Sequence, residues 1–208
     1  MRGHPRTGND RKKTMAQSSD ISIAQLGAVG SEDARYLVSL MRTIPDFPKP
    51  GILFRDFLPA MADPRGLRIL TDALVRTLPA DADSFDAVAG LEARGFLLGP
   101  QLALALGKGF IALRKKGKLP PRTLAQDYSL EYGTASIEAE EGAVHPGERV
   151  LVVDDLIATG GSAKAAADLI ERAGGQVAGF SFVMELEGLQ GRRTLEPHPI
   201  TALVSMPA

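Results

Sequence analysis

Short apolar runs alternate with amphipathic segments along most of the chain. Five runs have the length and composition of buried strands: 87–91, 110–114, 150–154, 178–184 and 201–205. Apolar residues at helical spacing predict helices at 31–42, 64–78, 95–106 and 161–173, and a short one at 188–195. Strands that alternate with helices predict an α/β fold with a doubly wound, mostly parallel five-stranded sheet.

Two parts of the chain depart from this alternation. Residues 115–138 form a long polar excursion, and such a segment inside a compact domain is usually a functional lid. Residues 1–13 carry a net charge of +4 and the first thirty residues show no apolar pattern, which favours a disordered leader at 1–30. A targeting or nucleic-acid-binding tail is the alternative. Residues 31–208 are then one domain.

The run 150–153 is apolar at every position, which is typical of a central strand covered by helices on both faces. Ligands bind at the carboxyl ends of such strands. There the chain continues through two carboxylates, Asp154 and Asp155, into the small residues 158–162 and a helix. Bare backbone N–H groups at the start of a helix attract an anion, so this loop predicts a phosphate site.

The carboxylate pair narrows the range of phosphate ligands that this loop could bind. The loop has neither the glycine pattern of a dinucleotide-binding loop nor the Gly-Lys-Ser/Thr sequence of a nucleoside triphosphatase. Asp154 and Asp155 only accept hydrogen bonds and suit vicinal hydroxyls. The segment therefore predicts a site for a ribose 5-phosphate, with the diol on the two aspartates. The alternative is a solvated acidic turn with a helix cap at Thr159.

A second anion loop is predicted at residues 92–95, between a strand and a helix. Arg94 there carries the planar fork that suits diphosphate oxygens, and a surface salt bridge between Glu92 and Arg94 is the alternative. Four basic residues cluster nearby: Arg114, Lys115, Lys116 and Lys118. Gly117 and two prolines break any helix, and no aromatic residues interleave to stack bases. A polyphosphate substrate is therefore a better partner for this basic segment than a nucleic acid.

Composition limits the classes of protein and of binding site that remain possible. The chain has 208 residues, 44% hydrophobic, with a formal net charge of −1. It has no cysteine, which excludes disulfides and thiolate metal sites, and its three histidines are scattered. No apolar stretch has membrane-spanning length. We expect a cytoplasmic enzyme without a membrane or nucleic-acid partner.

Residues 149–162 resemble the phosphoribosyl-pyrophosphate signature of the type I phosphoribosyltransferases. Four other segments occur in the right order and resemble the members of that family that use adenine: 47–56, 91–97, 114–120 and 128–133. The likeness runs from about residue 32 to about residue 195. It implies purine salvage, in which adenine and phosphoribosyl pyrophosphate give AMP and pyrophosphate. It also implies a small hood near 47–56 and a flexible lid at 115–138.

The resemblance assigns roles to residues. It implies ribose-5-phosphate binding by Asp154, Asp155, Ala158, Thr159, Gly160, Gly161 and Ser162. It implies pyrophosphate binding by Glu92, Ala93, Arg94, Arg114, Lys115, Lys118 and Tyr132, with a cis peptide before Ala93. The catalytic set is Glu131, as general base toward the purine, with Arg94, Asp154 and Asp155. Without the resemblance, the sequence around Glu131 predicts only an exposed glutamate on an edge strand.

Adenine binding is expected on the backbone of Leu53 and Arg55, with Phe54 stacking on the base. Leu186 is a weaker candidate for the opposite wall of the adenine site, and it could equally be an ordinary core residue. Mg²⁺ is the expected cofactor, carried by substrate phosphates with no dedicated protein ligand, and reached by Asp154 and Asp155 through water. A homodimer is implied by the resemblance.

Two alternatives stay open. A phosphoribosyltransferase for hypoxanthine, xanthine or orotate would share both phosphate sites. A non-catalytic, ligand-sensing regulator of the same fold would need a DNA-binding module, and the residues before Phe47 hold at most one helix.

Overall fold

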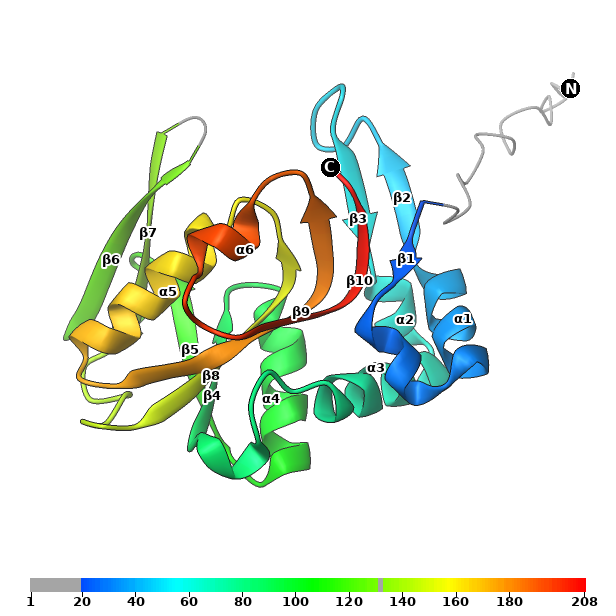
Figure 1. Ribbon diagram of the computed structural model, residues 1–208. Helices are drawn as coiled ribbons and strands as arrows, with labels where there is room; N and C mark the ends of the chain where they lie inside the picture. The colour runs from blue at the N-terminus through cyan, green and yellow to red at the C-terminus, as the bar shows by residue number, and fades with distance from the viewer. Residues whose placement is uncertain (1–19, 131–132) are drawn as a thin grey trace, which may run out of the picture.

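A mixed sheet forms the centre of the computed structural model, which describes residues 20–130 and 133–208 (Figure 1). Its strand order is β1-β10-β9-β8-β4-β5-β7-β6. The middle five strands are parallel: β10 (Ile200–Pro207), β9 (Gln176–Glu187), β8 (Arg149–Ile157), β4 (Ala87–Leu91) and β5 (Gly109–Lys115). These are the five predicted strands, and most are longer than predicted. The sheet has eight strands among the described residues, so the predicted count of five covers only its parallel part.

Antiparallel strands extend the sheet at both edges. β1 (Ser22–Ile23) pairs with β10, while β7 (Gly133–Glu140) pairs with β5 and with β6 (Thr123–Leu130). The predicted loop at 115–138 is therefore largely a β-hairpin, which rises at the left of Figure 1. Its base is anchored because Ile137 and Ala139 are buried in the core beside α5. Its flexibility as a lid stays a prediction.

Helices cover both faces of the sheet, as the doubly wound prediction requires. One layer contains η1 (Gln25–Val29), α1 (Ser31–Leu40), α2 (Leu58–Ala62), α3 (Pro64–Arg76) and α4 (Gly95–Leu106). The other contains α5 (Gly161–Arg172) and the short α6 (Gly191–Thr194). A 3₁₀ turn, η2 (Ala82–Ser84), precedes β4.

β8 is buried on both faces. Leu151 and Val153 pack in the core under α3 and α4, whereas Val150 and Val152 pack in the core under α5. All four side chains are fully buried. The strand therefore ends in the middle of the molecule, and its carboxyl end opens between the two helical layers.

The N-terminal segment differs from the prediction of a disordered leader through residue 30. Residues 22–23 form β1, residues 25–29 form η1, and Leu26 is fully buried in the core beneath α3. The side chain of Gln25 accepts a hydrogen bond from the backbone N–H of Ala202 at 3.2 Å. Elements this short carry no periodic pattern, which explains the error. Residues 1–19 lie outside the described part of the chain.

The predicted hood at 47–56 is the end of a β-hairpin: residues 53–56 form β3 (Leu53–Asp56), which pairs with β2 (Arg42–Pro45) in a separate two-stranded sheet. It stands at the top of Figure 1, beside the C-terminus. Arg55, which is buried, fixes it there: its guanidinium donates to Asp20, to the Thr43 hydroxyl and to the Pro207 carbonyl, at 2.5, 2.7 and 2.8 Å. One side chain thus joins the hood to both ends of the described chain.

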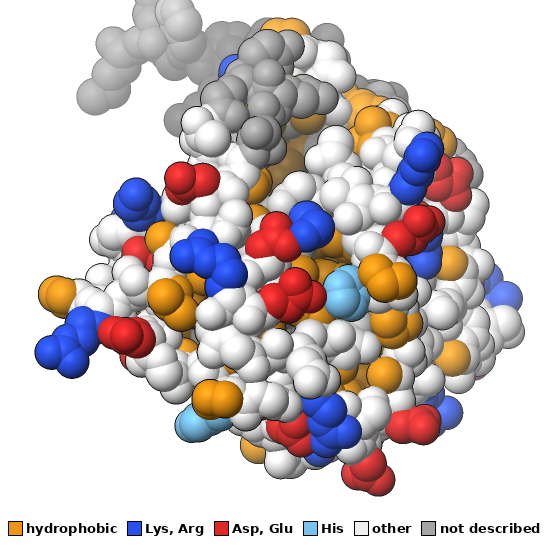
Figure 2. All heavy atoms as spheres, turned by 60° about the vertical axis from the view of Figure 1, so that its left-hand side comes forward, with side chains coloured by type: hydrophobic (Ala, Val, Ile, Leu, Met, Phe, Trp, Pro, Cys, Tyr) orange, Lys and Arg blue, Asp and Glu red, His pale blue; other side chains and the backbone are white. Residues whose placement is uncertain are grey.

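Acidic and basic side chains mix over the face that carries α5 (Figure 2). The ion pair of Lys164 and Asp168, four residues apart on α5, is an example. Within residues 20–130 and 133–208, no helix has both the length and the apolar character to cross a bilayer.

Candidate active site

A pocket of about 770 Å³ opens at the carboxyl end of β8. Its walls come from four parts of the fold: the loop before α4, the β6–β7 hairpin, the end of β8 with the segment that leads into α5, and the segment before α6. The lining residues are Arg94, Tyr128, residues 154–163 and Leu189. The predicted ribose-phosphate segment therefore lines one cavity along its whole length.

The floor of this pocket is the glycine loop 158–160 and the first turn of α5. Gly160 has a φ of +82°, in the left-handed region that favours glycine. A Cβ there would lie 2.8 Å from the carbonyl oxygen of Gly191, so a side chain is also sterically excluded. Among the described residues, no side chain caps the start of α5. Helix N–H groups without such a cap can bind an anion.

Asp154 and Asp155 stand next to this loop. The backbone N–H of Asp155 donates to Asp154 Oδ1 at 2.9 Å. Asp155 is 3% exposed, and its Oδ2 lies 2.9 Å from Arg94 Nε. That contact is an ion pair without hydrogen-bond geometry, so within the described part of the chain Oδ2 has no hydrogen-bond donor. A buried, charged oxygen with an unused acceptor position is suited to a ligand hydroxyl.

Burial dominates the electrostatics of this pair. It raises the pKa of Asp154 well above its ordinary value, and the neighbouring charge of Asp155 raises it further. Burial also raises the pKa of Asp155, and the Arg94 guanidinium opposes this change. Hydroxyl donors from a ligand would stabilise both carboxylates and relieve this penalty.

The loop 92–95 brings Arg94 to the pair. The Glu92–Ala93 peptide is cis, as the resemblance implied. The Arg94 guanidinium also lies 5.3 Å from the ring centroid of Phe54 in the hood. Arg94 thus contacts both the carboxylate pair and the hood.

Glu92 pairs with Arg114 rather than with Arg94, unlike the alternative salt bridge considered above. Glu92 Oε2 accepts from Arg114 Nε at 3.2 Å and from the backbone N–H of Lys115 at 3.1 Å. Burial raises the pKa of Glu92, but these donors outweigh it and leave the pKa below its ordinary value. The loop 92–95 is thereby tied to the start of the basic segment.

Glu138, which the sequence analysis missed, fixes the rest of that segment. Its buried carboxylate accepts from the backbone N–H groups of Lys118 and Leu119, at 3.0 and 3.1 Å, and from Thr123. Burial raises the pKa of Glu138, but these bonds together lower it below its ordinary value. Arg114 donates to the carbonyl of Lys118 at 2.8 Å, and the lysine side chains stay exposed. Nothing in the sequence distinguishes Glu138 from Glu140.

The predicted adenine residues lie outside the lining of the 770 Å³ pocket. Phe54 reaches it through Arg94 and packs edge-to-face against Phe47, with ring centroids 5.1 Å apart. Leu53 is exposed, and the Arg55 side chain points to Asp20 and Pro207. Leu186 is half-buried against the core. The structure therefore brings the residues predicted to bind the ribose phosphate into one pocket with Arg94, and leaves the residues predicted to bind adenine outside its lining.

Comparison with known proteins decides the family. A family model described as a phosphoribosyl transferase domain matches residues 62–200, which include the 92–95 loop, β8 and α5. The chain belongs to the phosphoribosyltransferase family. The sequence-based predictions of family and α/β fold are confirmed.

The relatives place it in the adenine branch of that family. The adenine phosphoribosyltransferase of Bifidobacterium animalis subsp. lactis (strain AD011) is 64% identical over 190 residues, covering 91% of this chain and 98% of the relative. That of Parvibaculum lavamentivorans is 58% identical over 163 residues, covering 78% and 92%.

Solved structures agree. The crystal structure of adenine phosphoribosyltransferase from Rhodothermus marinus has a TM-score of 0.78 and 46% identity, over 84% of this chain and 99% of that one. The Saccharomyces cerevisiae enzyme, complexed with an imino-altritol bisphosphate and adenine, has a TM-score of 0.76 and 43% identity, over 83% and 98%.

For a phosphoribosyltransferase, two further lining residues stand out. Tyr128, in the predicted lid, lines the pocket, and burial raises the pKa of its hydroxyl, with a smaller contribution from the charge of Asp154. Leu189 lines it from the segment before α6. Tyr128 lies in the 128–133 motif, so the sequence could have identified it as a site residue. No sequence motif marked Leu189. Glu131 and Tyr132 lie outside the described residues.

The donor set suits a magnesium ion brought by the substrate. Across residues 20–130 and 133–208, no group of three or more acidic or histidine side chains is placed to hold a metal. Mg²⁺ in phosphate-handling sites is commonly held by one or two carboxylates together with substrate phosphates. The pair Asp154 and Asp155 fits that pattern.

Proposed function

We propose that the protein transfers the 5-phosphoribosyl group of phosphoribosyl pyrophosphate to adenine, giving AMP and pyrophosphate in purine salvage. The proposal is carried by one observation: a buried carboxylate pair stands directly before a glycine loop that opens α5, inside one cavity. A sugar monophosphate offers the two groups that this cavity lacks, an anion for the amides and a diol for the carboxylates.

In this proposal the 5-phosphate lies on Ala158, Thr159, Gly160, Gly161 and Ser162. The 2- and 3-hydroxyls donate to Asp154 and Asp155, and one of them satisfies the buried Oδ2 of Asp155. Because such bonds favour the ionised carboxylates, binding would lower the pKa values that burial raises. Substrate binding should therefore release protons when the buffer pH is near these raised pKa values.

The diphosphate lies toward Arg94 and the basic segment, with contacts to Glu92, Ala93, Arg114, Lys115, Lys118 and Tyr132. As the bond from the anomeric carbon to the diphosphate breaks, negative charge grows on the leaving oxygen and positive charge on the ribose. Arginine and lysine stabilise the first, and the ionised Asp154 and Asp155 favour the second. Mg²⁺ bound to the diphosphate would neutralise further charge on the leaving group.

The adenine is proposed to lie in the hood, stacked on Phe54 and hydrogen-bonded to the backbone of Leu53 and Arg55, with Leu186 opposite. Backbone carbonyls accept from a 6-amino group and leave a 6-oxo group unpaired, which separates the two classes of purine. Glu131 removes the proton from the purine imidazole ring as N9 attacks. This role rests on the resemblance of the 128–133 motif.

Three finer predictions belong to the same proposal: use of Mg²⁺, a homodimeric assembly and a cytoplasmic location. The family resemblance supports all three. Light scattering of the purified protein tests the dimer, titration of activity with Mg²⁺ and a chelator tests the metal, and cell fractionation tests the location.

The decisive experiment measures pyrophosphate release with adenine, hypoxanthine, xanthine and orotate in turn, with and without Mg²⁺. We expect release with adenine, dependent on Mg²⁺, and a kcat/KM at least a hundredfold lower with 6-oxo purines, as is roughly expected when buried polar groups stay unpaired. Faster release with a 6-oxo purine would support the sister-enzyme alternative. DNA binding without turnover would support the regulator.

A further inference from the structure

The short helix α6 packs against the glycine loop that precedes α5. The Thr194 hydroxyl donates to the carbonyl of Thr159 at 2.8 Å. The two backbones also meet: a Cβ on Gly191 would lie 2.3 Å from the carbonyl oxygen of Ala158, and one on Gly160 would lie 3.0 Å from Thr194 Cβ. The loop is therefore in direct contact with α6 on one side and continues into α5 on the other.

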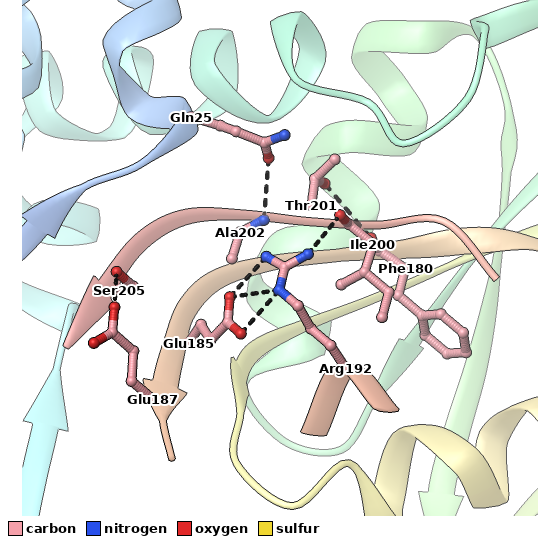
Figure 3. Close-up of polar contacts among 9 residues, drawn as sticks. All are labelled: Gln25, Phe180, Glu185, Glu187, Arg192, Ile200, Thr201, Ala202 and Ser205. Atoms are coloured by element: carbon pink, nitrogen blue, oxygen red, sulfur yellow. Dashed lines mark hydrogen bonds and ion pairs between the residues drawn. The ribbon is translucent and has the colours of Figure 1, made fainter. Parts of the chain in front are cut away.

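An ion pair holds α6 in place (Figure 3). Arg192 Nε lies 2.9 Å from both Glu185 oxygens, and Nη2 donates to Oε2 at 2.7 Å. Arg192 Nη1 also donates to the carbonyl of Ile200 at 3.1 Å. One guanidinium thus ties α6 to the carboxyl end of β9 and to the beginning of β10.

This anchor lies beside the strand that carries the aspartates. Glu185 is the register partner of Ile157 on β8, two residues after Asp155. Leu195, which follows α6, is fully buried in the core under α5, and Leu189, which precedes it, lines the pocket. The segment 189–195 therefore connects the core to the edge of the pocket.

We propose that α6 sets the conformation of the glycine loop, and that Thr194, Arg192 and Glu185 are positioning residues for the 5-phosphate. The inference rests on the proposed placement of the sugar phosphate on that loop. Gly160 and Gly161, at the junction of this loop with α5, give the backbone large conformational freedom. A site that is ordered before binding does not lose this entropy when the ligand arrives. The contact with α6 supplies this order without touching the ligand.

The first test compares Thr194→Val with Thr194→Ser. Valine keeps the shape and removes the donor to Thr159, whereas serine keeps the donor. We expect Thr194→Val to raise the KM for phosphoribosyl pyrophosphate and the Kd for AMP by about 3- to 10-fold, as is typical for the loss of one neutral hydrogen bond. The KM for adenine and the Tm should change little, and Thr194→Ser should behave as wild type.

The second test removes the anchor and uses a matched control. Arg192→Met breaks the pair with Glu185 beside the pocket. Arg149→Met breaks a similar pair with Asp86, where Arg149 Nε and Nη2 donate at 3.0 and 2.7 Å, at the opposite end of β8. We expect weaker AMP binding in Arg192→Met alone, with adenine affinity retained.

Calorimetric titration of each variant with AMP and with adenine separates the outcomes. Wild-type AMP affinity in both Thr194→Val and Arg192→Met overturns the role of α6. Equal losses for AMP and adenine with a lower Tm also overturn it, since they indicate general destabilisation. Asp155→Asn serves as a reference: if it too binds AMP normally, the proposed site itself is wrong, whereas a loss in Asp155→Asn alone rejects only the inference about α6.

Discussion

Neutralising Asp154 should stabilise the ligand-free protein while impairing its activity. Asn at this position keeps the oxygen that accepts from the backbone N–H of Asp155 at 2.9 Å, so Asp154→Asn mainly removes a charge. That charge is unfavourable without ligand, because burial and then the charge of Asp155 raise the pKa of Asp154. A carboxyl whose pKa is raised in the fold contributes stability at low pH, and this contribution is lost as pH rises through the folded pKa.

The size of the effect follows from the repulsion between the two carboxylates. Two unit charges about 4 Å apart repel by ~4 kcal/mol at an effective dielectric constant of about 20. Arg94, which is 2.9 Å from Asp155 Oδ2, offsets part of this repulsion. We therefore expect Asp154→Asn to raise the free energy of unfolding by roughly 1–2 kcal/mol at pH 8, a rise in Tm of about 2–8 °C for a chain of this size.

Thermal melts from pH 5 to pH 9 test this expectation. The gain in Tm should be largest at the alkaline end and should shrink as pH falls, while the KM for phosphoribosyl pyrophosphate rises at least tenfold. Asp168→Asn is the control, because that partly exposed carboxylate is paired with Lys164 on α5. A Tm of Asp154→Asn at or below wild type at pH 8 would refute the claim that the free pair is electrostatically unfavourable.

Three further predictions use other parts of the chain. Glu131→Gln should lower kcat by at least tenfold with little change in the KM for phosphoribosyl pyrophosphate, in steady-state assays; an unchanged kcat would remove Glu131 from catalysis. Glu138→Gln should raise that KM by about tenfold, since bonds to a charged acceptor are worth ~1.5–3 kcal/mol and two of its donors are the N–H groups of Lys118 and Leu119; the same assay with the exposed Glu140→Gln is the control. Deletion of residues 1–19 should leave Tm and turnover near wild type, whereas deletion of 1–30 should lower Tm markedly because it removes the buried Leu26, and Leu26→Ala alone should cost ~2–5 kcal/mol.

The sequence was sufficient to predict those features of the fold and the site that depend on residues close together in the chain. The apolar run of β8, the two aspartates and the glycine loop are consecutive, so their order in the chain is also their order in the pocket. The parallel strands could be predicted because each is a separate apolar run with helices between. The family motifs then supplied roles that spacing alone leaves open.

The rest depends on contacts between distant segments. Glu92 meets Arg114 because Leu91 and Leu113 are register partners on β4 and β5, and no rule about nearby charges contains that information. The inward position of Glu138 depends on the turn that it holds, at Lys118 and Leu119, which lies between β5 and β6 and far from Glu138 in the sequence. The contact between α6 and the glycine loop likewise exists only after β9 and β10 are in place.

The triple contact of Arg55 has a consequence for the topology of the chain. Since Asp20 and the Pro207 carbonyl bind the same guanidinium, the polypeptide path nearly closes on itself. A short glycine-rich bridge from residue 207 to residue 20 should therefore give a circular permutant, with new ends opened at Gly107, an exposed turn between α4 and β5. Such a rearranged enzyme would keep its pocket while its gene began in the middle of the present one.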